Sequence, residues 1–158
     1  MSDNFERPNW DEYFMLQARL AALRSNCMTR SVGAVIVRDH RQLATGYNGT
    51  PPGIKNCFEG GCQRCKDRME GKVKSGVGLD RCLCNHAEAN AIVQAAKNGV
   101  KINESEIYVT ASPCYNCFKL IANAGIKTIL NHELYRDDRI INRAKEVGIK
   151  LIGLENPI

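Results

Sequence analysis

The sequence predicts an α/β fold of three layers, with helices on both faces of one five-stranded mixed sheet. Over the C-terminal half, short apolar runs alternate with helical patterns, which is typical of parallel strands joined by right-handed crossovers. Near the N-terminus, two apolar runs flank the polar turn 38–42, which predicts an antiparallel hairpin. The expected sheet therefore combines an N-terminal hairpin with C-terminal parallel strands.

The first expected element is a helix that begins after Asn9. Asn9 is a favourable N-cap, and Glu12 stands three residues later, as in a capping box. The hairpin strands are expected at 32–37 and 43–46. Among the apolar residues that follow Asn9, we expect Trp10 and Phe14 to pack in the core. Helical spacing links Trp10, Phe14, Ala18, Ala21 and Ala22.

The later elements alternate regularly. Gly99, Gly125 and Gly148 each follow a helical pattern, and glycine is common just after a helix C-terminus because it readily adopts positive φ. No repeat or second domain is evident, so we expect one domain over residues 1–158. Helices are expected at 87–97, 114–124 and 136–147, and strands at 106–110, 126–130 and 149–154.

The segment from about residue 48 to 85 breaks this pattern and is expected to be a Cys-rich insert. It holds five of the eight cysteines, many glycines and only a weak helical pattern near 64–74. Long irregular segments inside a compact domain are usually functional or held by specific bonds. The insert is therefore expected to be anchored by its cysteines.

Composition narrows the class of protein. A chain of 158 residues with 44% hydrophobic and 25% charged residues can bury a substantial core. No apolar run is long enough to span a membrane and the N-terminus is not a signal peptide, so we expect a cytoplasmic protein with reduced cysteines. The net charge of +5 is scattered along the chain, which does not favour a nucleic-acid partner.

Two short motifs carry the chemistry. His86 and Glu88 stand two residues apart, and Cys114 and Cys117 follow within Pro-Cys-x-x-Cys, each pair near the start of an expected helix. This combination is the signature of zinc-dependent nucleobase deaminases. Hydrolytic zinc keeps three protein ligands and one position for water, which His86, Cys114 and Cys117 would provide. Glu88 would then transfer protons, whereas the alternative is a structural zinc site with Glu88 as a solvated helix-cap residue.

Longer stretches resemble the deoxycytidylate (dCMP) deaminase family, including its ComE-type bacterial members. The resemblance rests on the runs 32–37 (VGAVIV), 45–49 (TGYNG), 86–92 (HAEANAI) and 112–117 (SPCYNC) and extends over about residues 8–153. It implies a cytidine deaminase-like fold and hydrolysis of dCMP to dUMP and ammonia, which would supply thymidylate synthesis. The alternative enzymes are a deaminase of another pyrimidine nucleotide such as dCTP, a tRNA-adenosine deaminase, or a deaminase of free cytosine, guanine or a riboflavin precursor. The alternative outside enzymes is a zinc-stabilised binding module without activity.

The resemblance also implies substrate contacts. The Ala87 N–H and the Ser112 carbonyl would hold the pyrimidine, Asn48 would contact the sugar or base, and Tyr135 would line the nucleotide pocket. Lys97 takes the position at which some members use an arginine to select the substrate phosphate. Alternatively, Asn48 serves only the turn, Tyr135 only packs, and Lys97 is a solvated helix end.

Family members carry a second, structural zinc ion. Cys27 and Cys57 match its first two ligands, and we expect Cys62 and Cys82 to complete a closed four-ligand site. Cys65 and Cys84 are the alternates for these last two positions. The other interpretation is that all of these cysteines are buried or free thiols.

The final implication of the resemblance is regulation. It predicts a homo-oligomer, a hexamer, that is activated by dCTP with Mg²⁺ and inhibited by dTTP. Gly46 and Gly49 would offer exposed N–H groups to a nucleotide phosphate, with Arg24 and Arg30 nearby. The alternative is that these glycines only turn the chain.

Overall fold

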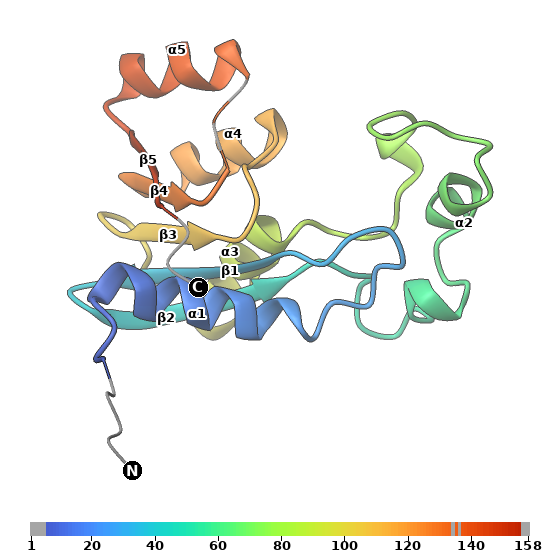
Figure 1. Ribbon diagram of the computed structural model, residues 1–158, viewed down its shortest axis with the longest axis horizontal. Coiled ribbons are helices and arrows are strands. Elements are labelled where there is room, and N and C mark those ends of the chain that lie inside the picture. The colour runs from blue at the N-terminus through green and yellow to red at the C-terminus, as the bar shows by residue number, and fades with distance from the viewer. Residues whose placement is uncertain (1–5, 134, 136, 156–158) are drawn as a thin grey trace.

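The predicted sheet is present in the computed structural model, which describes residues 6–133, 135 and 137–155 (Figure 1). The strand order is β2-β1-β3-β4-β5. β1 is antiparallel to β2 and β3, whereas β3, β4 and β5 are parallel, so the predicted five-stranded mixed sheet is confirmed. The strands are β1 (Gly33–Arg38), β2 (Arg41–Tyr47), β3 (Glu106–Val109), β4 (Thr128–Asn131) and β5 (Lys150–Gly153).

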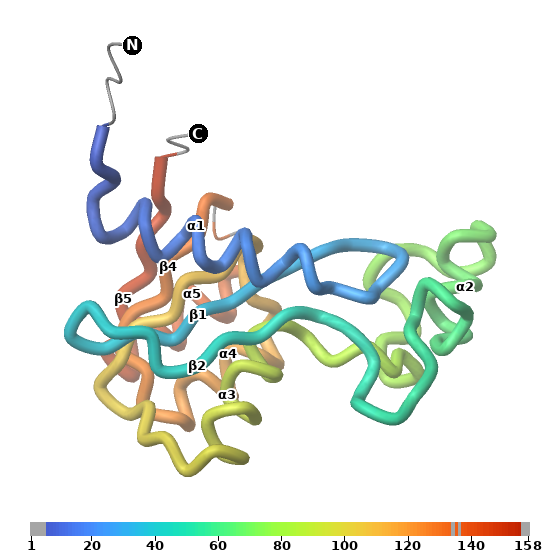
Figure 2. The backbone as a smooth tube through the Cα atoms, turned by 90° about the horizontal axis from the view of Figure 1, so that it is seen from below, coloured from blue at the N-terminus to red at the C-terminus, as the bar shows by residue number. Residues whose placement is uncertain are grey.

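Helices cover both faces of this sheet, which confirms the predicted three layers (Figure 2). On one face, Phe14 and Met15 of α1 pack with Val35 and Tyr108. On the other face, α3, α4 and α5 contribute residues to a second apolar core with Ile36 and the remaining strands. The helices are α1 (Trp10–Ala22), α2 (Gln63–Met69), α3 (Ala87–Asn98), α4 (Tyr115–Asn123) and α5 (Asp138–Val147).

Local capping explains several helix boundaries. The Asn9 side chain accepts a hydrogen bond from the Glu12 N–H at 2.9 Å, and the Glu12 carboxylate accepts one from the Asn9 N–H at 2.8 Å, so the predicted capping box is confirmed. Helix α5 begins at Asp138 because the Asp137 side chain caps it; the predicted start at residue 136 lies outside the described residues. Strand β4 begins two residues late because the Ile126 N–H still bonds to the end of α4.

Trp10 does not pack in the core, so its predicted burial is wrong. Its side chain is 46% exposed and stacks on His40, with 4.3 Å between the ring centroids. Helical spacing identifies a face of α1, but Trp10 is the first residue of that helix, where its ring meets the exposed hairpin turn at His40. Phe14, one turn later, is fully buried as predicted.

The Cys-rich insert extends from one end of the sheet (Figure 1). An isolated antiparallel bridge closes its base, since Gly49 and Asn85 exchange N–H···O bonds of 3.1 and 2.8 Å. The predicted short helix near 64–74 is α2, which starts one residue earlier. The bridge holds the chain directly before α3, the helix that carries His86 and Glu88. Within the described part of the chain, no helix has the length and apolar character to cross a membrane.

Candidate active site

The two predicted half-motifs meet where the N-termini of α3 and α4 converge. His86 is the N-cap of α3 and Cys114 is the N-cap of α4. Helix α4 follows β3 directly, so the site lies beyond the carboxyl end of a parallel strand, where sites of open α/β sheets are expected. Both helix N-termini favour negative charge there because their first N–H groups point outward.

The three predicted zinc ligands lie at the separations that a zinc ion requires. His86 Nδ1 is 3.5 Å from Cys114 Sγ and 3.4 Å from Cys117 Sγ. All three ligand atoms lie within 4.8 Å of one another. Tetrahedral zinc with ordinary Zn–N and Zn–S bonds separates its nitrogen and sulfur ligands by about 3.6 Å. The donor set therefore fits one zinc ion bound by His86, Cys114 and Cys117.

The electrostatics of Cys114 suit this role. Hydrogen bonding from the Cys117 thiol and from His86 lowers the pKa of Cys114 to about 4, against the partial burial that opposes ionisation. The Cys117 N–H also bonds to the Cys114 sulfur at 3.4 Å. Cys114 is thus held as a thiolate, the form of cysteine that ligates metals.

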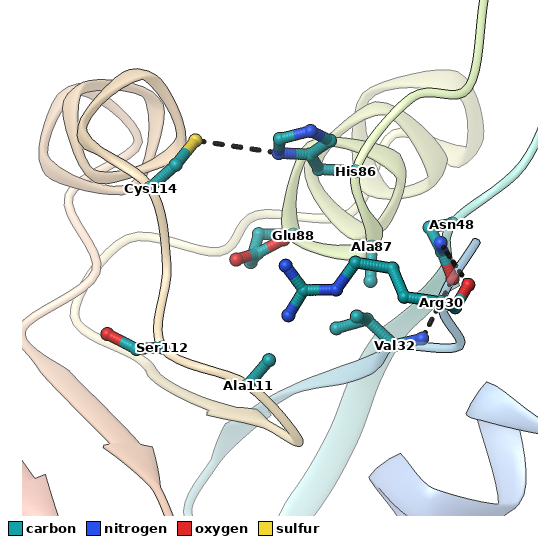
Figure 3. Close-up of a pocket in the computed structure, with 9 residues that line it drawn as sticks. All are labelled: Arg30, Val32, Asn48, His86, Ala87, Glu88, Ala111, Ser112 and Cys114. Carbon is teal, nitrogen blue, oxygen red and sulfur yellow. Dashed lines mark hydrogen bonds between the residues drawn. The ribbon is translucent and has the colours of Figure 1, made fainter. Parts of the chain in front are cut away.

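Glu88 lies beside the ligands without belonging to their set. Its side chain enters the same pocket, and the residue is only 4% exposed (Figure 3). Burial raises the pKa of the Glu88 carboxyl, while the nearby charges of His86 and Arg30 act in the opposite direction. A buried carboxyl with a raised pKa can accept and return a proton near neutral pH, which suits general acid–base catalysis.

These residues line a small cavity of about 70 Å³. Six predicted site residues meet there, and sequence reasoning missed two others, Val32 and Ala111, because apolar residues next to strands look like core. Arg30, predicted for a separate regulatory site, also lines this cavity. The full lining is Arg30, Val32, Asn48, His86, Ala87, Glu88, Ala111, Ser112 and Cys114 (Figure 3).

Asn48 reaches the cavity while its polar atoms organise the adjoining loop. Its side-chain oxygen accepts bonds from Ser25 Oγ at 2.6 Å and from the Val32 N–H at 2.8 Å. Its amide nitrogen donates to the Arg30 carbonyl at 2.8 Å. Asn48 is therefore a positioning residue for the segment that carries Arg30, and a direct contact with sugar or base stays a prediction.

Ala87 and Ser112 occupy opposite walls of the cavity (Figure 3). Ala87 is the first residue of α3, where a backbone N–H has no partner within the helix. The Ser112 N–H donates to the Glu133 carboxylate at 3.0 Å, which fixes the loop before Cys114. Their backbone groups are placed to meet a substrate, so the predicted pyrimidine contacts are compatible with the geometry.

Tyr135 and Lys97 do not line this cavity. The Tyr135 hydroxyl donates to the Ile129 carbonyl at 2.9 Å, and its side chain packs against the larger apolar core. Lys97 is exposed in the last turn of α3, roughly 16 Å along the helix from His86 at an ordinary helical rise. A contact between Lys97 and a substrate in this pocket of the same chain is therefore a wrong prediction, because the two lie at opposite ends of α3.

The expected N–H groups of Gly46 and Gly49 are not exposed, which corrects the basis of the regulatory prediction. Both residues are buried; Gly46 pairs with Ala34 in the hairpin, and the Gly49 N–H bonds to Asn85. Gly46 serves close packing instead, since a Cβ there would lie 2.2 Å from the Ala87 carbonyl oxygen. Arg24 is exposed beyond the end of α1.

The other six cysteines form a cluster at the base of the insert. The four predicted ligands Cys27, Cys57, Cys62 and Cys82 do not make one set of four. Cys27 and Cys57 lie in one group and Cys62 and Cys82 in another, and both groups include the alternates Cys65 and Cys84. All eight cysteines are free thiols in the structure.

Comparison with known proteins decides the family. The family model described as the cytidine and deoxycytidylate deaminase zinc-binding region matches residues 8–133. The chain belongs to the cytidine and deoxycytidylate deaminase family. The matched residues include all of His86, Glu88, Cys114 and Cys117, so the family signature coincides with the geometric site.

Individual family members agree with this assignment. The deoxycytidylate deaminase of Schizosaccharomyces pombe is 45% identical, over 96% of this chain and 46% of that protein. The ComE operon protein 2 of Bacillus subtilis is 45% identical, over 83% of this chain and 63% of that protein. The crystal structure of dCMP deaminase from cyanophage S-TIM5 with dCMP and dUMP has 33% identity and a TM-score of 0.74, covering 94% and 99% of the two chains. The chain thus spans about half the length of its fungal relative, and its structural match covers 99% of the phage enzyme's chain.

Proposed function

We propose that this protein is a zinc-dependent dCMP deaminase that converts dCMP and water to dUMP and ammonia and supplies thymidylate synthesis. The observation that carries the proposal is the convergence of His86, Cys114 and Cys117 around one point, with the non-ligand Glu88 buried beside them. A purely structural zinc site does not require that carboxylate. The names of the similar proteins support dCMP as the substrate.

Each residue of the site has a separate role in the proposed deamination. A zinc ion held by His86, Cys114 and Cys117 would supply a water molecule of lowered pKa. Glu88 takes one proton from the attacking water and passes it to the ring nitrogen beside the amine-bearing carbon. It then takes the second proton of the added water and delivers it to the amino group, which leaves as ammonia. The Ala87 N–H and the Ser112 carbonyl orient the pyrimidine between the two helix N-termini. The balance is dCMP plus water giving dUMP plus ammonia.

Arg30 supplies a reason for preferring a nucleotide over a nucleoside. The cavity is small, so the reacting base would enter it while the sugar and phosphate remain at its mouth. The Arg30 side chain is exposed and its guanidinium lies next to Glu88 (Figure 3). An arginine fork binds phosphate through paired, charge-assisted hydrogen bonds.

Arg30→Ala is therefore expected to lower kcat/KM for dCMP by roughly 10- to 100-fold, since hydrogen bonds to charged groups contribute about 1.5–3 kcal/mol. The rate with deoxycytidine, which lacks the phosphate, should change much less. Arg24→Ala is the matched control, because Arg24 is exposed beyond α1 and does not line the cavity. Equal losses on both substrates would contradict a phosphate contact.

A substrate panel tests the proposed activity itself. Rates with dCMP, dCTP, deoxycytidine and a tRNA anticodon stem, measured by absorbance, separate the leading proposal from its alternatives. Fast turnover of dCMP with slow turnover of the others is expected. A preference for dCTP would support hydrolytic deamination but with dCTP as the substrate. Turnover of the tRNA stem alone would contradict dCMP deamination and favour tRNA-adenosine deamination instead.

Regulation and assembly rest on family resemblance alone. We propose a hexamer that dCTP with Mg²⁺ activates and dTTP inhibits, each nucleotide binding one conformation more tightly than the other. Rate curves against dCMP should then be sigmoidal alone, hyperbolic with dCTP and Mg²⁺, and depressed by dTTP. Sedimentation in the same buffers measures the assembly. Hyperbolic curves that neither nucleotide changes would remove the regulatory proposal.

A cytoplasmic location and a single domain over residues 1–158 stay predictions.

A further inference from the structure

Six cysteine sulfurs gather at the base of the insert, in a group distinct from the three catalytic ligands. They form two overlapping sets of four, and within each set the sulfurs lie within 4.8 Å of one another. Two separate zinc sites of four cysteines would need eight sulfurs, whereas this cluster has six. The two sets share Cys65 and Cys84, and the complete sets are Cys27, Cys57, Cys65, Cys84 and Cys62, Cys65, Cys82, Cys84.

We propose that this cluster binds two zinc ions, with the sulfurs of Cys65 and Cys84 bridging them. Cys27 and Cys57 complete the first tetrahedron, and Cys62 and Cys82 complete the second. Six cysteines are known to hold two zinc ions in small Zn₂Cys₆ modules of unrelated fold. The proposal concerns metal content and does not depend on the deaminase activity proposed above.

The distances between the sulfurs match tetrahedral zinc. Zinc–sulfur bonds of ordinary length place two sulfurs of one tetrahedron about 3.8 Å apart. The Cys65 sulfur lies 3.9 Å from that of Cys27, 3.7 Å from that of Cys82 and 4.0 Å from that of Cys84. The sulfurs of Cys62 and Cys82 are 3.8 Å apart. Cys65 therefore stands at ligand distance from members of both sets, as a bridging thiolate must.

Backbone N–H groups donate hydrogen bonds to two of the outer sulfurs, those of Cys57 and Cys62. The Met28 N–H donates to Cys57 at 3.5 Å and the Leu83 N–H donates to Cys62 at 3.3 Å. Among the described residues, the hydrogen bonds found for the Cys65 and Cys84 sulfurs lead to other cysteine sulfurs. A terminal thiolate keeps more charge and benefits from donors, whereas a bridging thiolate shares its lone pairs between two metal ions.

Burial favours two ions over one. Cys57, Cys62, Cys65 and Cys84 are each at most 7% exposed. Six thiolates around one zinc ion would leave a net charge of minus four, and a second ion reduces it to minus two. Uncompensated charge is costly in a buried site, so a second ion stabilises the ionised cluster.

The cluster also connects two parts of the catalytic pocket. Cys84 is two residues before His86, and the intervening Asn85 bonds to Gly49. Cys27 is three residues before Arg30 and follows Asn26, whose side chain bonds to Thr50 and Asn56. Zinc binding at the cluster would therefore fix the segments that lead into both His86 and Arg30.

Zinc content of the purified full chain, from elemental analysis and native mass spectrometry, tests the proposal. Wild type should hold three zinc ions, and His86→Ala should hold two because only the catalytic ion is lost. Cys62→Ala should also hold two, because the catalytic ligands and the set of Cys27, Cys57, Cys65 and Cys84 remain. Two ions in wild type, or an unchanged count in Cys62→Ala, would overturn the binuclear cluster.

Cadmium substitution tests the bridges even if a cysteine variant fails to fold. In the cadmium-loaded wild-type protein, two of three NMR resonances should show scalar coupling to each other through the shared thiolates. The third resonance, from the catalytic site, should be uncoupled and absent in His86→Ala. Three uncoupled resonances would overturn the bridging role of Cys65 and Cys84 and leave the proposed deaminase activity untouched.

Discussion

Replacement of Glu88 by glutamine is expected to lower kcat by about 10²- to 10⁴-fold while zinc binding is retained. Glutamine keeps the shape of glutamate but cannot accept the proton of the attacking water. The carboxyl is buried in the pocket beside His86, and its burial-raised pKa suits proton exchange. Because one residue serves several proton transfers, the loss should lie at the upper end of this range.

The measurement pairs kcat for dCMP with zinc content on the same preparation. Glu104→Gln is a suitable control, since Glu104 is an exposed carboxylate that does not line the cavity. Full zinc content with lost turnover assigns Glu88 to the chemistry. A Glu88→Gln variant with near wild-type kcat would remove Glu88 from the mechanism.

Replacement of Gly46 by alanine is expected to disturb both stability and activity. The new Cβ would lie 2.2 Å from the Ala87 carbonyl oxygen and 2.4 Å from the Ala91 N, both backbone atoms that cannot turn aside. Overpacking of this kind destabilises proteins by about 1–3 kcal/mol or more. Helix α3 carries His86 and Glu88, and a displacement of about 1 Å at an active site can cost roughly 10²-fold in rate.

Thermal melting and kcat/KM of the folded fraction measure the two effects separately. Gly153→Ala is the matched control, because a Cβ there meets nothing within 4 Å. It should leave both quantities unchanged. If Gly46→Ala melts and turns over like Gly153→Ala, then the close packing of α3 on β2 does not position the site.

Much of the fold follows from local signals in the sequence. The capping box at Asn9 and Glu12 fixed the start of α1, and Gly99 and Gly148 end α3 and α5 with φ near +70°. The catalytic set was also predictable, because its ligands lie in two short motifs whose spacing reflects one chemistry. The helix-capping residues and the two ligand motifs are each local in the sequence, so both can be identified without knowledge of the tertiary structure.

Other features depend on contacts between distant segments. Arg30 reaches the catalytic pocket because Asn48 holds its loop, and no motif marks that arrangement. Family resemblance predicts Lys97 at the substrate, yet the length of α3 separates Lys97 from His86. The division of six cysteines into two overlapping sets likewise depends on how the insert folds back on Cys27, which spacing alone does not reveal.

The most direct test of the proposed activity is product analysis with dCMP in heavy-oxygen water. The wild-type protein should release dUMP and ammonia in equal amounts, with one solvent oxygen atom in each new carbonyl, and Cys114→Ala should release neither. Mass spectrometry of dUMP and an ammonia assay on the same samples give both quantities. Failure of zinc-loaded wild type to form dUMP, or dUMP without solvent oxygen, would contradict hydrolytic deamination at this site.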